Sequence, residues 1–458
     1  MSSWLRQYGG TILLVILAFA YLTRMYRLNL PEKYMFDEVY HAVTAKLIAQ
    51  NDPRAYEWWN PPPEPNTAVD WLHPPLAKYF QALSIVAFGE NSFGWRFSSV
   101  VFGTMVIVLV YHLSYQLTQR QGVALTAAAL ASFDGLLLVQ SRIAMNDIDV
   151  TFFILLTLLL YLKYRQNLAW HLLLLTGISL GLAMASKWSG IFILFSIWFF
   201  EILQLKLFLF QINWKKWREQ LLTKKNLNQS LQFLGFLVVM PVLVYILSYT
   251  QMFLQGKDWH HFVKLHQQII YYQTHLKETH PYQSRPLQWA LDLRPVWYNV
   301  EYLGPSRSDI YAFGNPILYW AGLLAVIALL LTGVQTLFSR LTVKGLKLKK
   351  TIILLLKAAL QSPVFVLLSS YFAVWLPWQF SPRIMFFYHY TPAVPFLCIL
   401  LSIQLSRLYQ RGGVYQLMVI GLVSSIFVCF LIWYPHLVGI PVANQLANWL
   451  YFGIKSWK

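Results

Sequence analysis

The sequence has 458 residues, of which 57% are hydrophobic and only 12% are charged, and its formal net charge is +18. Soluble domains carry charge on about a quarter of their residues, so this composition excludes an ordinary soluble protein and predicts one that crosses a membrane many times. Basic residues on the inner face and anionic headgroups explain the excess positive charge, so we expect membrane lipids and no nucleic acid as partners.

Apolar runs and helix-breaking residues predict about eleven membrane spans in a single domain, residues 1–458, and hence an all-α polytopic membrane fold. No internal repeat is evident. Cys398 and Cys429 both lie inside apolar runs, which predicts two buried thiols and no disulfide framework. The predicted spans cover residues 9–26, 93–118, 123–139, 150–164, 168–185, 191–210, 231–249, 316–338, 360–378, 385–405 and 414–434.

Lysine and arginine concentrate in the connections that follow the even-numbered predicted spans, with almost no acidic residues beside them. Such connections are expected to stay in the cytoplasm, because basic residues near span ends are retained on that side of the membrane. The same rule predicts a cytoplasmic N-terminus. An odd number of spans then leaves the C-terminus on the extracytoplasmic side.

Two long connections, residues 28–92 and 250–315, remain for the extracytoplasmic face, and they hold most of the acidic residues. In the first, helical periodicity appears over residues 39–50 and 74–88, separated by the proline-rich segment 60–65. Two interfacial helices would fold this loop back onto the membrane. Because catalysis needs mixed charges, we expect the active site on this face.

The first long loop contains two adjacent carboxylates, Asp37 and Glu38, shortly beyond the first predicted span. If the loop folds back, Asp37 is pressed against the span ends and becomes a candidate general base. The alternative is a solvated acidic turn at a helix end, which is what most adjacent Asp–Glu pairs are.

Four basic residues are expected on tight turns or span starts of the same face, where the positive-inside rule makes them rare. Arginine forms bidentate contacts with phosphate oxygens and lysine supplies a point charge, so a cationic cluster beside carboxylates predicts a phosphate ligand next to a general base. Each residue alone could instead be a side chain that snorkels to a lipid headgroup. The four are Arg96, Arg142, Lys187 and Arg383.

The remaining candidates are acidic residues and histidines near the same turns. Asp149, at the start of the fourth predicted span, is best explained as a complement to the helix dipole, whereas Asp147 could hold Arg142 or a substrate hydroxyl. His73 and His389 could each donate to a phosphate or be packed interfacial rings. No histidine pair has a recognised metal-binding spacing, so we assign no metal and leave a divalent cation as an open alternative.

Six motifs occur in order along nearly the whole chain. They are Phe36-Asp37-Glu38-Val39, His73-Pro74-Pro75-Leu76-Ala77-Lys78, Ser141-Arg142 followed by Asp147, Lys187-Trp188 before Gly190, Arg294-Pro295-Val296-Trp297-Tyr298, and Tyr388-His389-Tyr390-Thr391-Pro392-Ala393. Together they resemble the protein O-mannosyltransferases, and the last two resemble the bacterial branch of that family.

The resemblance implies a membrane-embedded glycosyltransferase of the type C (GT-C) fold. It implies transfer of mannose from a polyprenyl (dolichyl-type) phosphate donor to Ser or Thr hydroxyls of secreted or membrane proteins, on the outer side of the plasma membrane. It also implies that Asp37 is the base and Glu38 its companion, with the four basic residues at the donor phosphate. Eukaryotic members carry a β-trefoil domain between spans seven and eight, for which the loop 250–315 is too short.

These parts predict a single in-line displacement with inversion, in which Asp37 takes the acceptor proton and the cations stabilise the leaving phosphate. Two alternatives remain. A sibling GT-C enzyme could move another sugar or use a lipid or glycan acceptor. A transporter or lipid flippase is less favoured, because ionisable residues cluster at span ends on one face and not near mid-span.

Overall fold

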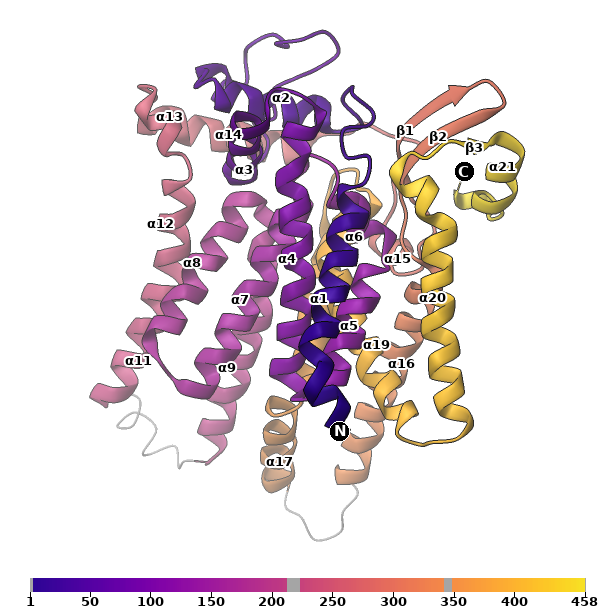
Figure 1. Ribbon diagram of the computed structural model, residues 1–458. Helices are drawn as coiled ribbons and strands as arrows, with labels where there is room; N and C mark the ends of the chain where they lie inside the picture. The colour runs from indigo at the N-terminus through magenta and orange to yellow at the C-terminus, as the bar shows by residue number, and fades with distance from the viewer. Residues whose placement is uncertain (1–2, 212–222, 342–347, 458) are drawn as a thin grey trace.

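The computed structural model describes residues 3–211, 223–341 and 348–457. Its helices form an upright bundle that carries a cap of short helices and strands at one end, and the two chain termini lie at opposite ends of the bundle (Figure 1). Two of the basic connections used to predict the orientation, residues 212–222 and 342–347, lie outside the described residues.

Among the described residues, eight helical stretches are long and apolar enough to cross a membrane, and the predicted polytopic α-helical fold is confirmed. The bundle consists of α1 (Ser3–Met25), α4 (Ser92–Thr118), α5 (Gln121–Ser132), α6 (Gly135–Gln140), α7 (Asp147–Asn167), α8 (Trp170–Ser186), α9 (Phe192–Gln211), α11 (Lys224–Leu234), α12 (Met240–Leu247), α16 (Pro316–Leu341), α17 (Leu348–Leu360), α18 (Pro363–Trp375), α19 (Val394–Tyr409) and α20 (Val414–Val438).

Three of the predicted spans correspond to helices outside that set of eight, namely α5 with α6, α7, and α8. The span predicted over residues 123–139 is interrupted at Asp134. The Asp134 carboxylate accepts a hydrogen bond from the Leu137 amide at 2.7 Å and caps the start of α6. Because this side chain satisfies the first amides of a new helix, α5 ends after 12 residues and the chain turns.

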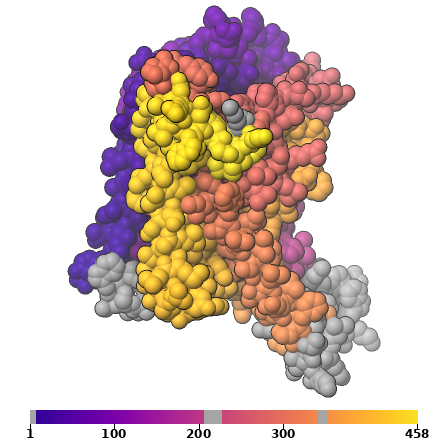
Figure 2. Space-filling view, turned by 90° about the vertical axis from the view of Figure 1, so that its right-hand side faces the viewer, coloured from indigo at the N-terminus to yellow at the C-terminus, as the bar shows by residue number. Residues whose placement is uncertain are grey.

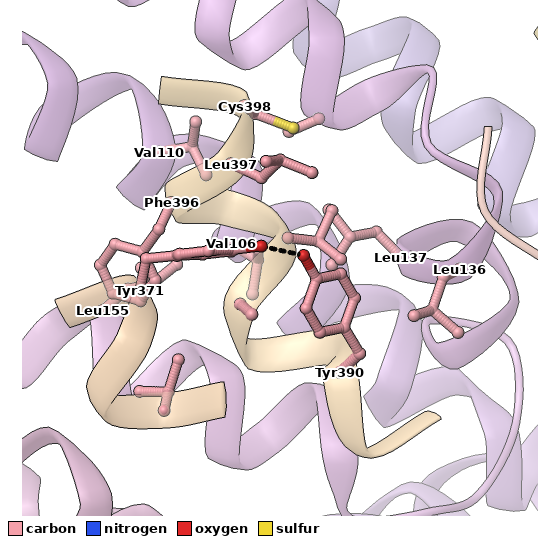
Figure 3. Packing of buried hydrophobic residues seen from close by; sticks show 14 of the residues in the cluster. Val106, Val110, Leu136, Leu137, Leu155, Tyr371, Tyr390, Phe396, Leu397 and Cys398 are labelled. Carbon is pink, nitrogen blue, oxygen red and sulfur yellow. Dashed lines mark hydrogen bonds between the residues drawn. The ribbon is translucent and has the colours of Figure 1, made fainter. Parts of the chain in front are cut away.

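The core of the bundle lies where α4, α6, α7, α18 and α19 meet, and it is filled by fully buried aliphatic and aromatic side chains (Figure 3). Val106 of α4, Leu155 of α7 and Phe396 of α19 all have no exposed surface. The hydroxyls of Tyr371 and Tyr390 are hydrogen-bonded to each other inside this apolar region. The pair therefore satisfies two polar groups that would otherwise destabilise the core.

The cap is formed by the two long loops of the sequence analysis (Figure 1). The first contributes α2 (Glu38–Ala49) and α3 (Leu76–Phe88), which lie close to the bounds predicted for its two helices. The second contributes α13 (Thr250–Leu254), α14 (Trp259–His275), the single turn α15 (Pro286–Trp289) and a β-hairpin. This arrangement places α2 and α3 at the end of the bundle opposite the N-terminus (Figure 1).

A small sheet in the cap was not predicted. Strands β1 (Val296–Leu303) and β2 (Ser306–Ala312) pair antiparallel, with a bulge after Trp297, and β3 (Val442–Ala443) adds to the edge of β2. Gly304 has a φ of +64°, which the tight turn between β1 and β2 requires. Helix α21 (Asn444–Tyr451) and a short 3-10 turn (Lys455–Trp457) follow β3. In Figure 2, which shows the right-hand side of Figure 1, the C-terminal segment in yellow faces the viewer.

Candidate active site

A cavity of about 650 Å³ lies between the cap and the adjoining ends of the bundle helices. Ligand pockets commonly have volumes of about 300–1,000 Å³, so a hexose with its phosphate is within the range. Three of the predicted site residues, Glu38, Arg96 and Arg142, do not line this cavity. The other predicted site residues do, and they come from five segments of the chain: Asp37, His73, Asp147, Lys187, Arg383 and His389.

Asp37 immediately precedes α2, and its carbonyl accepts hydrogen bonds from the amides of Tyr40 and His41 at 3.0 Å. Its side-chain Oδ2 accepts a hydrogen bond from the Tyr388 hydroxyl at 3.3 Å. Burial raises the pKa of Asp37 to about 6, against the opposing effect of His41 and Lys187. A carboxyl group with a pKa near neutrality is both ionised and basic enough to accept a proton in a reaction.

Aromatic packing holds the turn that presents Asp37. The preceding residue, Phe36, has a φ of +48°, which is uncommon for a bulky side chain. Its ring stacks on Tyr298 of β1 at 4.5 Å between centroids, and the Tyr298 hydroxyl accepts a hydrogen bond from Gln140 at 2.7 Å. The unpredicted hairpin therefore supports the backbone at the candidate base.

Glu38 is fully buried and faces away from the cavity, where it is paired with Arg96. Its two oxygens accept from Arg96 Nε at 2.8 Å and Nη2 at 2.7 Å, and from the amides of Met35 and Ala144 at 3.0 and 3.1 Å. Arg96 also donates to the carbonyls of Leu28, Pro31 and Lys33. This geometry therefore does not support the predicted contact between Arg96 and a donor phosphate. Arg96 instead anchors the start of α2.

Arg142 also points away from the cavity. It is buried, and its guanidinium donates to the carbonyls of Thr23, Arg24 and Arg27 at the C-terminal end of α1. The last carbonyls of a helix have no partner within it, so an arginine satisfies those of Thr23 and Arg24 well. The structure thus gives Arg142 the role of joining the end of α1 to the turn before α7, and Arg142 does not line the cavity that contains Asp147.

Lys187 and Asp147 form a buried ion pair on the cavity wall, with 2.7 Å between Nζ and Oδ1. Lys187 lies in extended backbone directly after α8, while Asp147 is the first residue of α7. The lysine ammonium is also 5.3 Å from the centre of the Tyr388 ring, and the hydroxyl of that ring donates to Asp37. Tyr388 therefore connects the candidate base with the candidate phosphate-binding cation.

Asp149 lies in the first turn of α7, as its predicted role at the helix dipole requires.

Arg383 and His389 line the cavity from the segment between α18 and α19. Arg383 Nη1 donates to Gln273 of α14, so the guanidinium is held by the second loop. His389 Nδ1 lies 3.0 Å from the Phe386 carbonyl, and its ring stacks on Trp289 and Tyr388. Because Nδ1–H donates to that carbonyl, Nε2 is the atom left for a ligand.

Several polar atoms on this cavity wall are buried and have no hydrogen-bond partner among the described residues: Asn146 Oδ1 and Nδ2, Asp147 Oδ2 and Arg383 Nε. Buried polar atoms in native proteins are nearly always satisfied, so these four atoms mark polar groups of the wall that the described side chains leave unbonded. Together they offer both donors and acceptors. Sugar hydroxyls, which donate and accept, match this set.

Asp70 is a cavity-lining carboxylate that the sequence analysis did not single out. Its carboxylate lies 2.7 Å from Lys78 Nζ, 2.8 Å from His41 Nδ1 and 2.9 Å from His73 Nδ1. Burial alone would raise the pKa of Asp70, but these three partners hold it well below its usual range. The sequence feature that could have identified Asp70 is its position just before the motif that contains His73 and Lys78.

The same cluster bears on the predicted role of His73 and on metal binding. Burial lowers the pKa of His73 to about 4, so its ring is neutral at pH 7 and would meet a phosphate only as a neutral donor. One ligand atom each from His41, Asp70 and His73 lies within 4.8 Å of the others, a set that could hold a divalent ion. Lys78 already supplies a positive charge to Asp70. The Asp70 carboxylate and His73 Nδ1 are also hydrogen-bonded directly to each other.

Two family models together match most of the chain. Residues 14–255 match the model described as dolichyl-phosphate-mannose-protein mannosyltransferase, and residues 258–457 match the C-terminal four TMM region of protein-O-mannosyltransferase. The chain belongs to the protein O-mannosyltransferase family. The predicted resemblance to these membrane glycosyltransferases is thereby confirmed.

Individual relatives agree with this family. A polyprenol-phosphate-mannose–protein mannosyltransferase of Corynebacterium glutamicum is 27% identical over 84% of this chain and 81% of its own length. The enzyme of the same name from Mycolicibacterium smegmatis is 25% identical over 99% and 94%. In the S. cerevisiae Pmt1-Pmt2 complex bound to the sugar donor, a chain superposes with a TM-score of 0.78 and 16% identity, covering 98% of this protein and 92% of that chain. The three similarities span the bundle and the cap.

Exchanging Glu38 for glutamine keeps its shape but leaves the buried Arg96 without a counter-charge. We expect Glu38→Gln to lower the free energy of unfolding by about 3–5 kcal/mol, measured as reduced thermal stability of the purified protein in detergent. Asp37→Asn is the matched control, because it removes a carboxylate whose charge is disfavoured by burial and is expected to leave the unfolding temperature unchanged or slightly higher. Equal losses of stability in both variants would contradict the anchoring role.

Proposed function

We propose that the protein transfers mannose from a polyprenyl (dolichyl-type) phosphate mannose donor to Ser or Thr hydroxyls of acceptor proteins. The observation that carries this proposal is that Asp37, Lys187 and Arg383 line one cavity in a chain of the protein O-mannosyltransferase family. The names of its relatives, polyprenol-phosphate-mannose–protein mannosyltransferases, support the choice of donor and of a protein as acceptor.

The donor end of the cavity would hold the lipid phosphate. Lys187 and Arg383 supply positive charge there, and cations placed where negative charge develops stabilise the transition state of phosphate departure. Ile191, Phe192 and Trp378 line the same cavity and give an apolar surface for the first isoprene units. The sugar then lies near Asn146 and Asp147, whose unpartnered polar atoms would bond its hydroxyls.

Asp37 would act as the general base. A Ser or Thr hydroxyl attacks the anomeric carbon from the side opposite the phosphate, and Asp37 takes its proton as the new bond forms. The C–O bond to the phosphate breaks in the same step, so the configuration inverts. Tyr388 orients the Asp37 carboxylate through its hydroxyl and keeps Lys187 beside the same ring.

The active site is assigned to the extracytoplasmic side of the plasma membrane. This assignment is supported by the cytoplasmic location that the positive-inside rule predicts for the basic connections and by the mixed charges of the two long loops. Secreted or membrane proteins would present their Ser and Thr residues to the cavity on that side.

The central test is Asp37→Asn, which keeps the size of the side chain but removes the base. We expect mannose transfer to fall by about 10²–10⁴-fold, while binding of the donor lipid is retained. Transfer is measured with radiolabelled polyprenyl-phosphate mannose and an acceptor peptide, and donor binding with the same lipid alone. Full transfer activity in the variant would exclude Asp37 as the base.

The pKa of Asp37 also predicts the pH dependence of transfer. A general base works only when deprotonated, so kcat/KM should rise with pH, reach half its plateau at about pH 6, and fall to about a tenth of the plateau at pH 5. Initial rates between pH 4.5 and 8, with enzyme stability checked at each pH, measure this curve. A wild-type profile that stays flat across this range would contradict the assignment.

Lys187→Gln is expected to raise the KM for the donor lipid by at least about tenfold, because it removes a cation at the proposed phosphate and leaves Asp147 unpaired nearby. Arg142→Gln is the comparison, since Arg142 binds carbonyls of α1; folded protein carrying it should keep a normal donor KM. Donor saturation curves at fixed acceptor concentration provide both values. An unchanged donor KM in Lys187→Gln would remove this residue from the phosphate site.

A further inference from the structure

A second large cavity lies at the opposite end of the bundle from Asp37. Its volume is about 530 Å³, and its walls are the ends of α4, α7, α9 and α17 and the start of α18. Figure 1 shows α17 at the end of the bundle that carries the N-terminus. Helix α7 begins with Asp147 in the active site and reaches this cavity at Arg165, a helical rise of about 27 Å. The two cavities are therefore separate sites.

The polar wall of this second cavity is basic. Arg165 and Lys357 line it, and no aspartate or glutamate of the described chain does. Arg165 Nη1 lies 3.3 Å from Glu201 behind the wall, and Glu201 also accepts a hydrogen bond from Tyr161 at 2.6 Å. Lys357 is exposed and has no ion-pair partner among the residues that the structure describes. Arg165 is thus paired with one carboxylate, whereas Lys357 has no counter-charge within the described chain.

Uncharged donors extend the same wall. Glutamine amides and a serine hydroxyl line the cavity beside the two cations, from Gln116, Gln166, Gln204, Gln361 and Ser362. Guanidinium, ammonium and amide groups are the donors that proteins use for phosphate oxygens. The chemistry of this wall therefore fits a phosphate group better than a neutral polar ligand.

The rest of the cavity wall is apolar and comes from Leu117, Leu162, Phe200, Leu360, Pro363 and Val366. A free inorganic anion would gain nothing from such a surface. A molecule with an anionic head and a hydrocarbon tail would use both walls, because its head would meet the polar donors while its tail stayed against apolar side chains. The arrangement of charge and apolar surface thus indicates a lipid.

We propose that this cavity binds the phosphate headgroup of an anionic phospholipid from the membrane leaflet at that end of the bundle. Arg165 and Lys357 select an anionic headgroup over a zwitterionic one, and the apolar wall receives the first part of the acyl chains. The bound lipid connects α7 with α17 and α18 and stabilises their packing. This inference does not depend on the transfer reaction, which takes place in the other cavity.

Native mass spectrometry of the full-length protein released from detergent tests the proposal. The protein is titrated separately with phosphatidylglycerol, phosphatidylcholine of the same acyl chains, polyprenyl phosphate and inorganic phosphate. We expect phosphatidylglycerol to bind at least about tenfold more tightly than phosphatidylcholine. Lys357→Gln and Arg165→Gln should each weaken phosphatidylglycerol binding by at least about fivefold.

Lys163→Gln is the matched control, because Lys163 is an exposed cation on the same helix that does not line the cavity. It should leave phosphatidylglycerol binding unchanged. Since Lys357 is exposed, Lys357→Gln is expected to fold normally, and its thermal stability without added lipid verifies this. Binding that is equal in wild type, Lys357→Gln and Arg165→Gln would overturn the proposal. Preference for polyprenyl phosphate, or for inorganic phosphate, with the same dependence on Lys357 would also overturn it and reassign the cavity.

Discussion

The buried ion pair between Glu38 and Arg96 is the contact on which the active-site end of the molecule depends. Four hydrogen bonds converge on the Glu38 carboxylate, and they tie the start of α2 to α4 and to the turn before α7. A charge buried in this way cannot shift without leaving its partner uncompensated, so the geometry is fixed. Asp37 is the neighbouring residue and takes its position from this anchor.

The two adjacent carboxylates consequently have different surroundings, and these surroundings suit them to different roles. Glu38 accepts four hydrogen bonds, whereas the side chain of Asp37 accepts one from the residues described, that of Tyr388, and lines a cavity. Burial without sufficient donors raises the pKa of Asp37, and that is the property a general base needs. A solvated acidic turn, the alternative reading of the sequence, would have given neither carboxylate this environment.

Local patterns in the sequence predicted much of this arrangement. Helical periodicity placed α2 and α3 nearly at their observed bounds, and apolar runs placed most of the bundle. The hairpin and Asp70 were missed for a physical reason, because their importance comes from partners distant in the chain. Tyr298 of β1 acts by stacking on Phe36, and periodicity within either segment carries no information about that contact.

The four basic residues show what local sequence patterns do not reveal. All four were predicted at a phosphate because cations near span ends are costly, yet an arginine can also be satisfied by protein carbonyls. Arg96 and Arg142 donate to backbone carbonyls at the end of α1 and in the loop that follows it. Lys187 and Arg383 keep donor capacity directed at a cavity, and Arg383 Nε has no partner within the described chain. The cations proposed to meet a ligand therefore differ from Arg96 and Arg142 in lining the cavity, and this difference exists only once the chain has folded.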